Sequence, residues 1–180
     1  MMGLIIVTLL ECVALILVGM LIISLWQTIK GAAPFVPIPT ETLDAIMGTL
    51  QLSAGSRLYD LGSGDGRVLK RAVTTHPDVT AVGVDHGYFP YIIATLRRIP
   101  RTTFLRRDLF TLDLAPATHI FIYLFPEMVD RLLPKFQQEL QSGTRVVSCD
   151  FPFSSKQPIQ VVRLEQTKTA RAHTLYVYIF

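Results

Sequence analysis

Hydrophobic and polar positions divide this chain into two parts that meet near residue 30. Residues 4–26 form an almost unbroken apolar run in which Glu11 is the only charged side chain. As a helix at ~1.5 Å per residue, this run would be about 34 Å long, which is enough to cross a hydrocarbon core of ~30 Å. The pattern therefore predicts one N-terminal transmembrane helix. The predicted domains are a transmembrane anchor at 1–29, a proline-rich linker at 30–40 and a folded domain at 41–180.

The alternative for the N-terminal run is a signal peptide that is cleaved near Gly31-Ala32-Ala33. Two features favour the membrane span: no Lys or Arg precedes the run, and it is longer than the usual h-region of ~7–15 residues. Lys30 favours a cytoplasmic position for everything that follows it. The sequence thus predicts a single-pass membrane protein that contacts the lipid bilayer through residues 4–26, with its domain on the cytoplasmic or matrix-equivalent side.

Beyond Thr40 the apolar period switches repeatedly between that of a helix and that of a strand. Helical spacing predicts helices near 41–50, 67–75, 88–99 and 126–142. Short apolar runs bounded by turn residues predict strands near 57–61, 79–84, 103–107, 120–124, 145–150, 159–164 and 174–180. Only nine residues separate Asp108 from Thr118, too few for a full crossover helix. The order predicts an α/β fold that ends in an antiparallel hairpin.

The turn after the first predicted strand carries the most informative residues of the chain. Asp60-Leu61 leads into Gly62-Ser63-Gly64-Asp65-Gly66, and a helix follows. In such a strand, glycine turn and helix, backbone amides face a bound ligand. Two carboxylates would repel a pyrophosphate but suit a ligand with a cationic end. The spacing also differs from the dinucleotide G-x-G-x-x-G pattern, which argues against a nicotinamide reductase.

This stretch resembles motif I of the class I S-adenosylmethionine-dependent methyltransferases. The resemblance implies a Rossmann-like seven-stranded sheet with helices on both faces, and S-adenosyl-L-methionine as the cofactor. Asp85 lies 21 residues after Gly64 at the end of the second predicted strand, where a carboxylate takes ribose hydroxyls. Asp108 ends the third strand, where the resemblance implies a contact with the adenine amino group. The expected cofactor-binding residues are Asp60, Gly62, Ser63, Gly64, Asp65, Gly66, Asp85, His86, Asp108 and Leu109.

Each of these carboxylates also has a purely structural interpretation. Asp60 could cap a turn, Asp85 could be a helix N-cap and Asp108 could begin a loop. Their occurrence at three successive strand ends favours the ligand interpretation, because open α/β sheets bind ligands along that edge.

Two further segments narrow the resemblance. Pro34-Phe35-Val36-Pro37 follows the apolar run, and Cys149-Asp150-Phe151-Pro152-Phe153 follows the fifth strand. Together with motif I they resemble the small membrane-anchored lysine methyltransferases that modify the ATP synthase c-subunit and the adenine nucleotide translocase. The resemblance implies lysine methylation of a membrane protein. The chain departs from that pattern at Asp150, where a basic residue is expected, at Asp85-His86-Gly87 in place of Glu-Asn-Pro, and at Ser154-Ser155.

Methyl transfer to an amine needs a neutral nucleophile, so a group that orients the amine or accepts its proton is expected. Tyr123, Glu127 and Asp150 are the candidates near the ends of the fourth and fifth strands. Tyr123 could equally be a core aromatic residue, and Glu127 a carboxylate of a first helical turn. The sequence alone does not single out a catalytic base.

Composition excludes several other classes of site. The two cysteines and four scattered histidines show neither disulfide nor metal-ligand spacing, so no metal is expected. The formal net charge is only +3. The one concentration of basic residues, Arg97 to Arg107, is not interleaved with stacking aromatic residues, so we expect no nucleic-acid partner. It could contact anionic lipid headgroups. The alternatives to lysine methylation are a methyltransferase for a small or lipid-like molecule and a non-catalytic cofactor-binding subunit.

Overall fold

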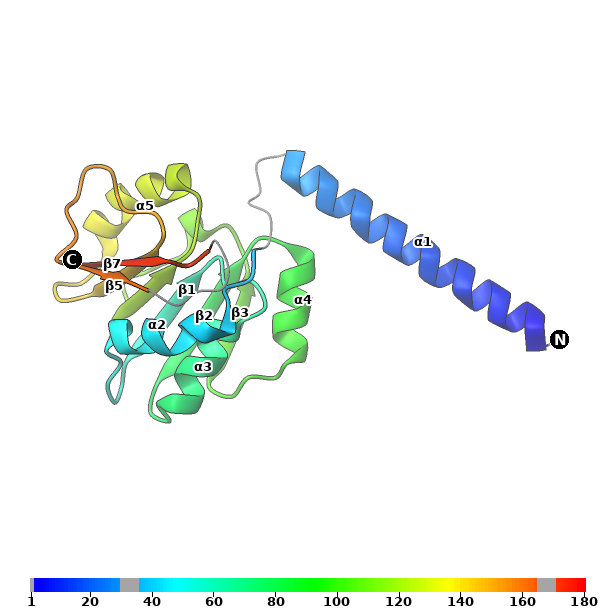
Figure 1. Cartoon of the computed structure of the whole chain (residues 1–180), viewed down its shortest axis with the longest axis horizontal. Helices are drawn as coiled ribbons and strands as arrows, with labels where there is room; N and C mark the ends of the chain where they lie inside the picture. The colour runs from blue at the N-terminus through cyan, green and yellow to red at the C-terminus, as the bar shows by residue number, and fades with distance from the viewer. Residues whose placement is uncertain (1, 30–35, 165–170) are drawn as a thin grey trace. The chain divides into compact units, whose positions relative to one another are not determined.

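The computed structural model describes residues 2–29, 36–164 and 171–180. Contacts divide the chain into two units, Met1–Pro34 and Phe35–Phe180. Helix α1 (Met2–Ile29) is the only helix or strand described in the first unit (Figure 1). The boundaries of the anchor and linker predicted from the sequence stay predictions.

The membrane prediction requires a correction. Crossing a bilayer demands a helix that is both long enough and apolar enough. Among the residues that the structure describes, no helix meets both requirements. The prediction of a single-pass membrane protein, spanning the bilayer through residues 4–26, is therefore wrong on this finding.

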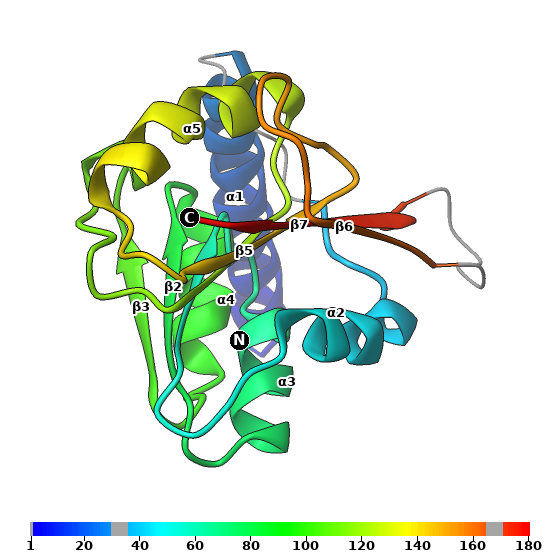
Figure 2. The same ribbon diagram turned by 90° about the vertical axis from the view of Figure 1, so that its left-hand side faces the viewer.

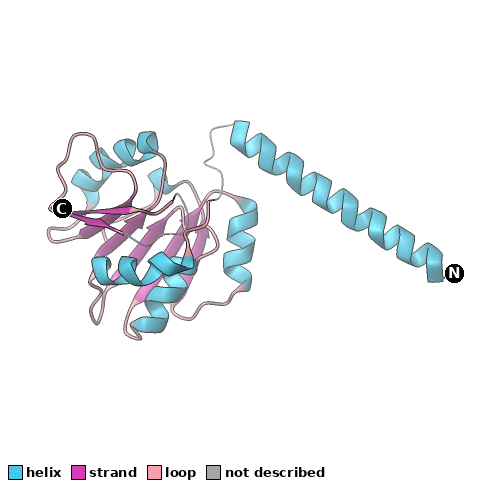
Figure 3. Ribbon diagram, in the orientation of Figure 1, coloured by secondary structure: helices cyan, strands magenta, loops and turns pink. Residues whose placement is uncertain are grey.

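The second unit is built on one seven-stranded mixed sheet (Figure 3). Its strands are β1 (Arg57–Leu61), β2 (Thr80–Asp85), β3 (Thr102–Arg106), β4 (His119–Ile122), β5 (Arg145–Cys149), β6 (Gln160–Arg163) and β7 (Thr174–Ile179). They lie in the order β3-β2-β1-β4-β5-β7-β6. The first five are parallel, and β7 runs antiparallel to both β5 and β6. The predicted α/β sheet with its closing hairpin is confirmed.

Helices cover the two faces of this sheet unequally (Figure 2). On one face lie α2 (Leu43–Leu50), α3 (Arg67–Thr75) and α4 (Tyr88–Leu96), and on the other lies α5 (Pro126–Glu139). The short connection from β3 to β4 holds only the 3-10 turn η2 (Leu109–Thr111), as the spacing predicted. A second 3-10 turn, η1 (Thr40–Thr42), leads directly into α2.

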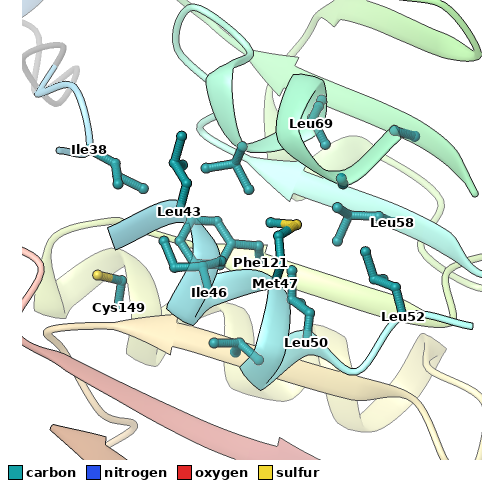
Figure 4. Packing of buried hydrophobic residues seen from close by; sticks show 14 of the residues in the cluster. Ile38, Leu43, Ile46, Met47, Leu50, Leu52, Leu58, Leu69, Phe121 and Cys149 are labelled. Carbon is teal, nitrogen blue, oxygen red and sulfur yellow. The ribbon is translucent and has the colours of Figure 1, made fainter. Parts of the chain in front are cut away.

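The core beneath α2 and α3 reaches back into the segment that the sequence assigned to the linker. Ile38 is only 6% exposed and packs in the same cluster as Ile46 and Leu69 (Figure 4). Residues before Thr40 therefore contribute to the packing of the second unit. The second core cluster lies between the sheet and α5 and includes Leu132 and Phe136.

The third and fourth predicted helices differ from the observed ones only at their ends. Helix α4 stops at Leu96 rather than Ile99, and Arg98 then adopts a positive φ of 46°. This backbone conformation does not belong to a right-handed helix. The chain consequently turns back toward β3 three residues earlier than the periodicity predicts.

Candidate active site

The glycine turn joins β1 to α3 and is held against the end of β2. Gly62, Gly64 and Gly66 all have positive φ, which L side chains rarely adopt. The backbone N–H groups of Gly62 and Ser63 both donate to the carbonyl of Val84, at 2.8 and 3.0 Å. A side chain at position 62 would also strike Leu124, since a Cβ there would lie 2.7 Å from its Cδ2. The turn therefore needs glycine for its conformation, and a side chain at position 62 would also require Leu124 to shift.

Asp85, predicted to take ribose hydroxyls, stands at the carboxyl end of β2 and fixes the same turn. Its Oδ2 accepts a hydrogen bond from the Gly64 N–H at 2.9 Å, and its Oδ1 accepts from the Gly87 N–H at 2.8 Å. Burial raises the pKa of Asp85 despite these two bonds. A carboxylate has about four acceptor sites, so these backbone N–H groups leave acceptor capacity for a ligand.

Asp60 is the most unusual group of the site. It is the second-last residue of β1 and is only 3% exposed, yet its side chain makes no hydrogen bond with any described residue. Burial, together with the negative charges of Asp85 and Asp65, raises the pKa of Asp60 well above its ordinary value. No fully enclosed side-chain oxygen or nitrogen of the described residues lacks a partner, so the oxygens of Asp60 retain some access to solvent. A carboxyl group in this position suits a cationic ligand.

Asp65 lies in the same turn but has a different role. Arg67 binds both of its oxygens, at 2.9 and 2.8 Å, and Arg97 from the end of α4 adds a third contact at 2.8 Å. Burial alone would raise the pKa of Asp65, but the hydrogen bonds and charges of the two guanidiniums lower it. Its charge is thus neutralised within the protein, whereas the sequence suggested that it faces a cationic ligand.

The other expected cofactor-binding residues, Asp108 among them for the adenine contact, lie at the ends of the neighbouring strands. Asp108 follows β3, is exposed, and caps η2 by accepting the Phe110 N–H at 2.9 Å. Leu109 is buried beside it, and His86 is exposed after β2. The fold therefore brings the carboxylates of β1, β2 and β3 to one edge of the sheet. The cap on η2 also matches the structural interpretation of Asp108.

The three candidate catalytic residues occupy different environments. Tyr123 is half-buried after β4, and burial, followed by the charge of nearby Asp150, raises its pKa to about 12. Asp150 has a positive φ of 62° and accepts backbone N–H groups from Ala172, His173 and Thr174 at 2.7, 2.7 and 3.1 Å. Glu127 is exposed in the first turn of α5. Tyr123 and Asp150 are brought together, and Asp150 is already engaged in holding the start of β7.

Sequence reasoning missed Arg67, which connects the glycine turn to the segment before α2. Its Nη1 donates to the carbonyl of Ile38 at 2.6 Å while the rest of the guanidinium binds Asp65. A hollow of about 580 Å³ adjoins it, lined by Pro37, Ile38, Pro39, Thr40, Glu41, Arg67 and Arg171. A signal was present: a basic residue at the first position of a helix opposes the helix dipole and needs a specific reason.

Comparison with known proteins identifies the class of site. Residues 60–160 match the family profile described as the ANTKMT methyltransferase domain. The chain belongs to this family. It is an S-adenosylmethionine-dependent methyltransferase, as the glycine turn and the carboxylates at the strand ends predicted.

Individual relatives support the assignment over most of the chain. A protein-lysine N-methyltransferase of Saccharolobus islandicus (strain REY15A) is 29% identical over 151 residues, covering 81% of this chain and 92% of the relative. The lysine N-methyltransferase of the ATP synthase c-subunit from Homo sapiens is 32% identical over 139 residues, or 73% of this chain. This chain spans only 58% of that human relative.

A solved structure extends the comparison to three dimensions. An RNA methyltransferase of Salinibacter ruber, in complex with S-adenosyl-L-homocysteine, superposes with a TM-score of 0.72 at 32% identity, covering 80% of this chain and 93% of that one.

The residues of this site fit the methyl donor of the family. The unpartnered carboxyl of Asp60 lies where a cationic group would compensate its buried charge. Asp85 keeps acceptor sites for hydroxyl groups, and the glycine turn leaves room for close approach of a ligand to the backbone. When bound, the cofactor supplies a methyl group activated by a positively charged sulfur.

Proposed function

We propose that this methyltransferase modifies the ε-amino group of a lysine in a protein, and that the protein is an integral membrane protein. The relatives named as lysine methyltransferases support the amine, and the one named for the ATP synthase c-subunit supports the membrane protein. We further propose that Asp60, Asp85 and Asp108, with the glycine turn, hold the cofactor. The single observation that carries this assignment is the buried and unpartnered Asp60 at the carboxyl edge of the sheet.

The amine would approach across the ends of β4 and β5, where Tyr123 and Asp150 lie. A lysine with a pKa of ~10.4 is neutral in only about one molecule in a thousand at pH 7, so the site must favour the neutral form. The raised pKa of Tyr123 keeps its hydroxyl protonated, so it can donate or accept a hydrogen bond but is no base at neutral pH. We propose that Tyr123 orients the lone pair of the amine toward the methyl group, so that it acts by positioning the substrate.

The test is transfer of radiolabelled methyl groups from S-adenosylmethionine to isolated membranes by the purified full-length chain. We expect label in a protein band, recovered as methylated lysine after hydrolysis. Asp85→Ala should abolish it, because the variant loses the hydrogen bonds to Gly64 and Gly87 along with the ligand contact. Asp78→Ala is the matched control, since Asp78 is exposed and its side chain makes no hydrogen bond or ion pair with a described residue.

RNA is a second candidate substrate, because the Salinibacter ruber protein that shares this fold at 32% identity is named an RNA methyltransferase. Adding total RNA to the same assay separates the two. Label in RNA and none in protein would overturn lysine methylation. Label only in the lipid extract would indicate a lipid-like acceptor. Cofactor binding without transfer to any of the three fractions would indicate a non-catalytic protein.

A further inference from the structure

Helix α4 exposes an apolar stripe that no described residue of the second unit covers. Pro90 and Ala94 face the sheet and are buried, whereas Tyr88, Ile92 and Leu96 recur every four residues on the opposite side. Their exposed fractions are 52%, 46% and 75%, and Phe89 beside them is 51% exposed. Single exposed apolar residues are ordinary, but four on one short helix form a patch that usually marks an interaction site. Figure 1 shows α4 beside β3 at the edge of the sheet.

The stripe is bounded at each end by arginine residues. Arg98 and Arg101 follow the last turn of α4, Arg106 ends β3, and Arg107 comes directly after it. The guanidinium of Arg106 lies 3.9 Å from the ring centroid of Tyr88, so the strand end and the start of the helix belong to one surface. We call the four apolar side chains and these four arginines the α4 surface.

The charge of the α4 surface is largely uncompensated. From His86 to Arg107 the sequence contains five arginines and no acidic residue. Within the described part of the chain, Arg97 is the one of the five that is paired with a carboxylate, since it binds Asp65. Arg101 donates to the carbonyl of Val73 at 2.6 Å, which leaves its charge unneutralised. The side chains of Arg98 and Arg107 have no partner among the described residues. Asp108, the nearest acidic residue in sequence, caps η2.

We propose that the α4 surface binds the plane of an anionic lipid bilayer. Aromatic and aliphatic side chains flanked by arginine characterise helices that lie in the membrane interface, with the apolar groups among the acyl chains and the cations at the headgroups. An acidic protein or RNA would match the charge but not four exposed apolar side chains. Tyr88 follows Gly87, which donates to Asp85, so this contact would bring the cofactor edge of the sheet to the membrane surface.

The contact is peripheral and belongs to the second unit. It does not depend on which substrate is methylated, because lipid binding can be measured directly. Its success or failure is therefore independent of lysine methylation.

The test uses the full-length chain with a polarity-sensitive fluorophore on a single cysteine. Ile92→Cys in a Cys12→Ser background reports on the α4 surface, because the remaining Cys149 is buried. Ile159→Cys before β6, at a side chain that is 64% exposed in the native chain, is the matched reporter elsewhere. Vesicles contain phosphatidylcholine alone or with roughly one third phosphatidylserine. We expect a blue shift at position 92 with the anionic vesicles, and little change at position 159.

Two variants identify the forces involved. Arg98→Gln with Arg107→Gln should weaken vesicle binding about 25-fold, at about fivefold per arginine near an anionic surface. Leu96→Glu should weaken it by removing the most exposed apolar group. Both variants should keep the wild-type affinity for S-adenosylhomocysteine, which shows that they fold. Equal responses at positions 92 and 159, or no dependence on lipid charge, would overturn the proposal. A response at position 92 to RNA rather than to vesicles would assign the surface to nucleic acid instead.

Discussion

At the scale of a single residue, the buried carboxyl of Asp60 lowers the stability of the folded chain while it suits the site for a ligand. Its folded-state pKa lies well above the ordinary 3.8, so the folded chain still holds this proton at pH values where the unfolded chain has already released it. The free energy of unfolding therefore falls as the pH rises through the window between the two values. A cationic ligand reverses this by stabilising the ionised carboxylate.

The variant Asp60→Asn removes this titration while keeping the shape of the side chain. Without cofactor we expect it to be about 1 kcal/mol more stable than the wild type at pH 8, a typical gain on relieving a strained functional site. The difference should vanish below about pH 3, under the ordinary aspartate value of 3.8, where both states hold the proton. Affinity for S-adenosylmethionine should fall more than tenfold. Urea unfolding at the two pH values and calorimetric titration measure these effects. A variant less stable than the wild type at pH 8 would contradict the account.

Single residues also show where sequence reasoning reached its limit. The positions of Asp60, Asp85 and Asp108 at strand ends follow from motif and periodicity. The neutralisation of Asp65 does not, because its partner Arg97 is 32 residues away and is placed by the packing of α4. Asp150 likewise binds three backbone N–H groups 22 to 24 residues ahead, a contact that only the antiparallel return of β7 creates.

At the scale of elements, Arg67 connects the glycine turn, the start of α3 and the segment before η1.

The ranges of the strands and helices were predictable because each has its own period of apolar residues. Contacts between elements were not, because they depend on side chains that reach across the fold. The guanidinium of Arg67 donates both to the carbonyl of Ile38 and to the carboxylate of Asp65, and no local sequence pattern predicts that arrangement.

Replacing Arg67 by alanine removes both its ion pair with Asp65 and its hydrogen bond to the carbonyl of Ile38. The buried Asp65 then keeps only Arg97, and its pKa should rise toward or above the ordinary value. Because the wild-type pKa is depressed, the ion pair stabilises the fold above that ordinary value and loses this effect as the pH falls through the folded-state pKa. We expect a loss of about 1–3 kcal/mol at pH 7, discounted for the partial exposure of Arg67, that narrows in acid. Urea denaturation at neutral and acidic pH measures it.

Arg97→Ala is the matched control for that variant, because Arg97 binds Asp65 but not Ile38. Both variants should lose stability, but only Arg67→Ala should also expose the segment before η1 to added protease. Equal proteolysis of the two variants would show that the Ile38 contact contributes nothing.

At the scale of the whole molecule, the question is where the second unit begins. The sequence places the start of the folded domain at residue 41, after three prolines. In the structure, the Ile38 side chain lies in the core and its carbonyl accepts a hydrogen bond from Arg67. The N–H and the hydroxyl of Thr42 both donate to the carbonyl of Pro39. The segment from Pro37 to Pro39 thus lines the hollow and also closes the packing over α2.

A chain that begins at Val36 should therefore behave differently from one that begins at Thr42. We expect the longer one to unfold at the temperature of the second unit in the full-length protein. The shorter one loses the buried Ile38 side chain, a change that costs about 2–4 kcal/mol in a well-packed core and lowers Tm by roughly 5–10 °C at this size. It should also bind S-adenosylhomocysteine more weakly, because Arg67 loses its contact beside the glycine turn. Calorimetric unfolding and titration of both chains measure this, with Ile38→Ala in the full-length protein as the matched control. If the two chains proved equally stable, the segment before η1 would be a linker after all, as its prolines suggested.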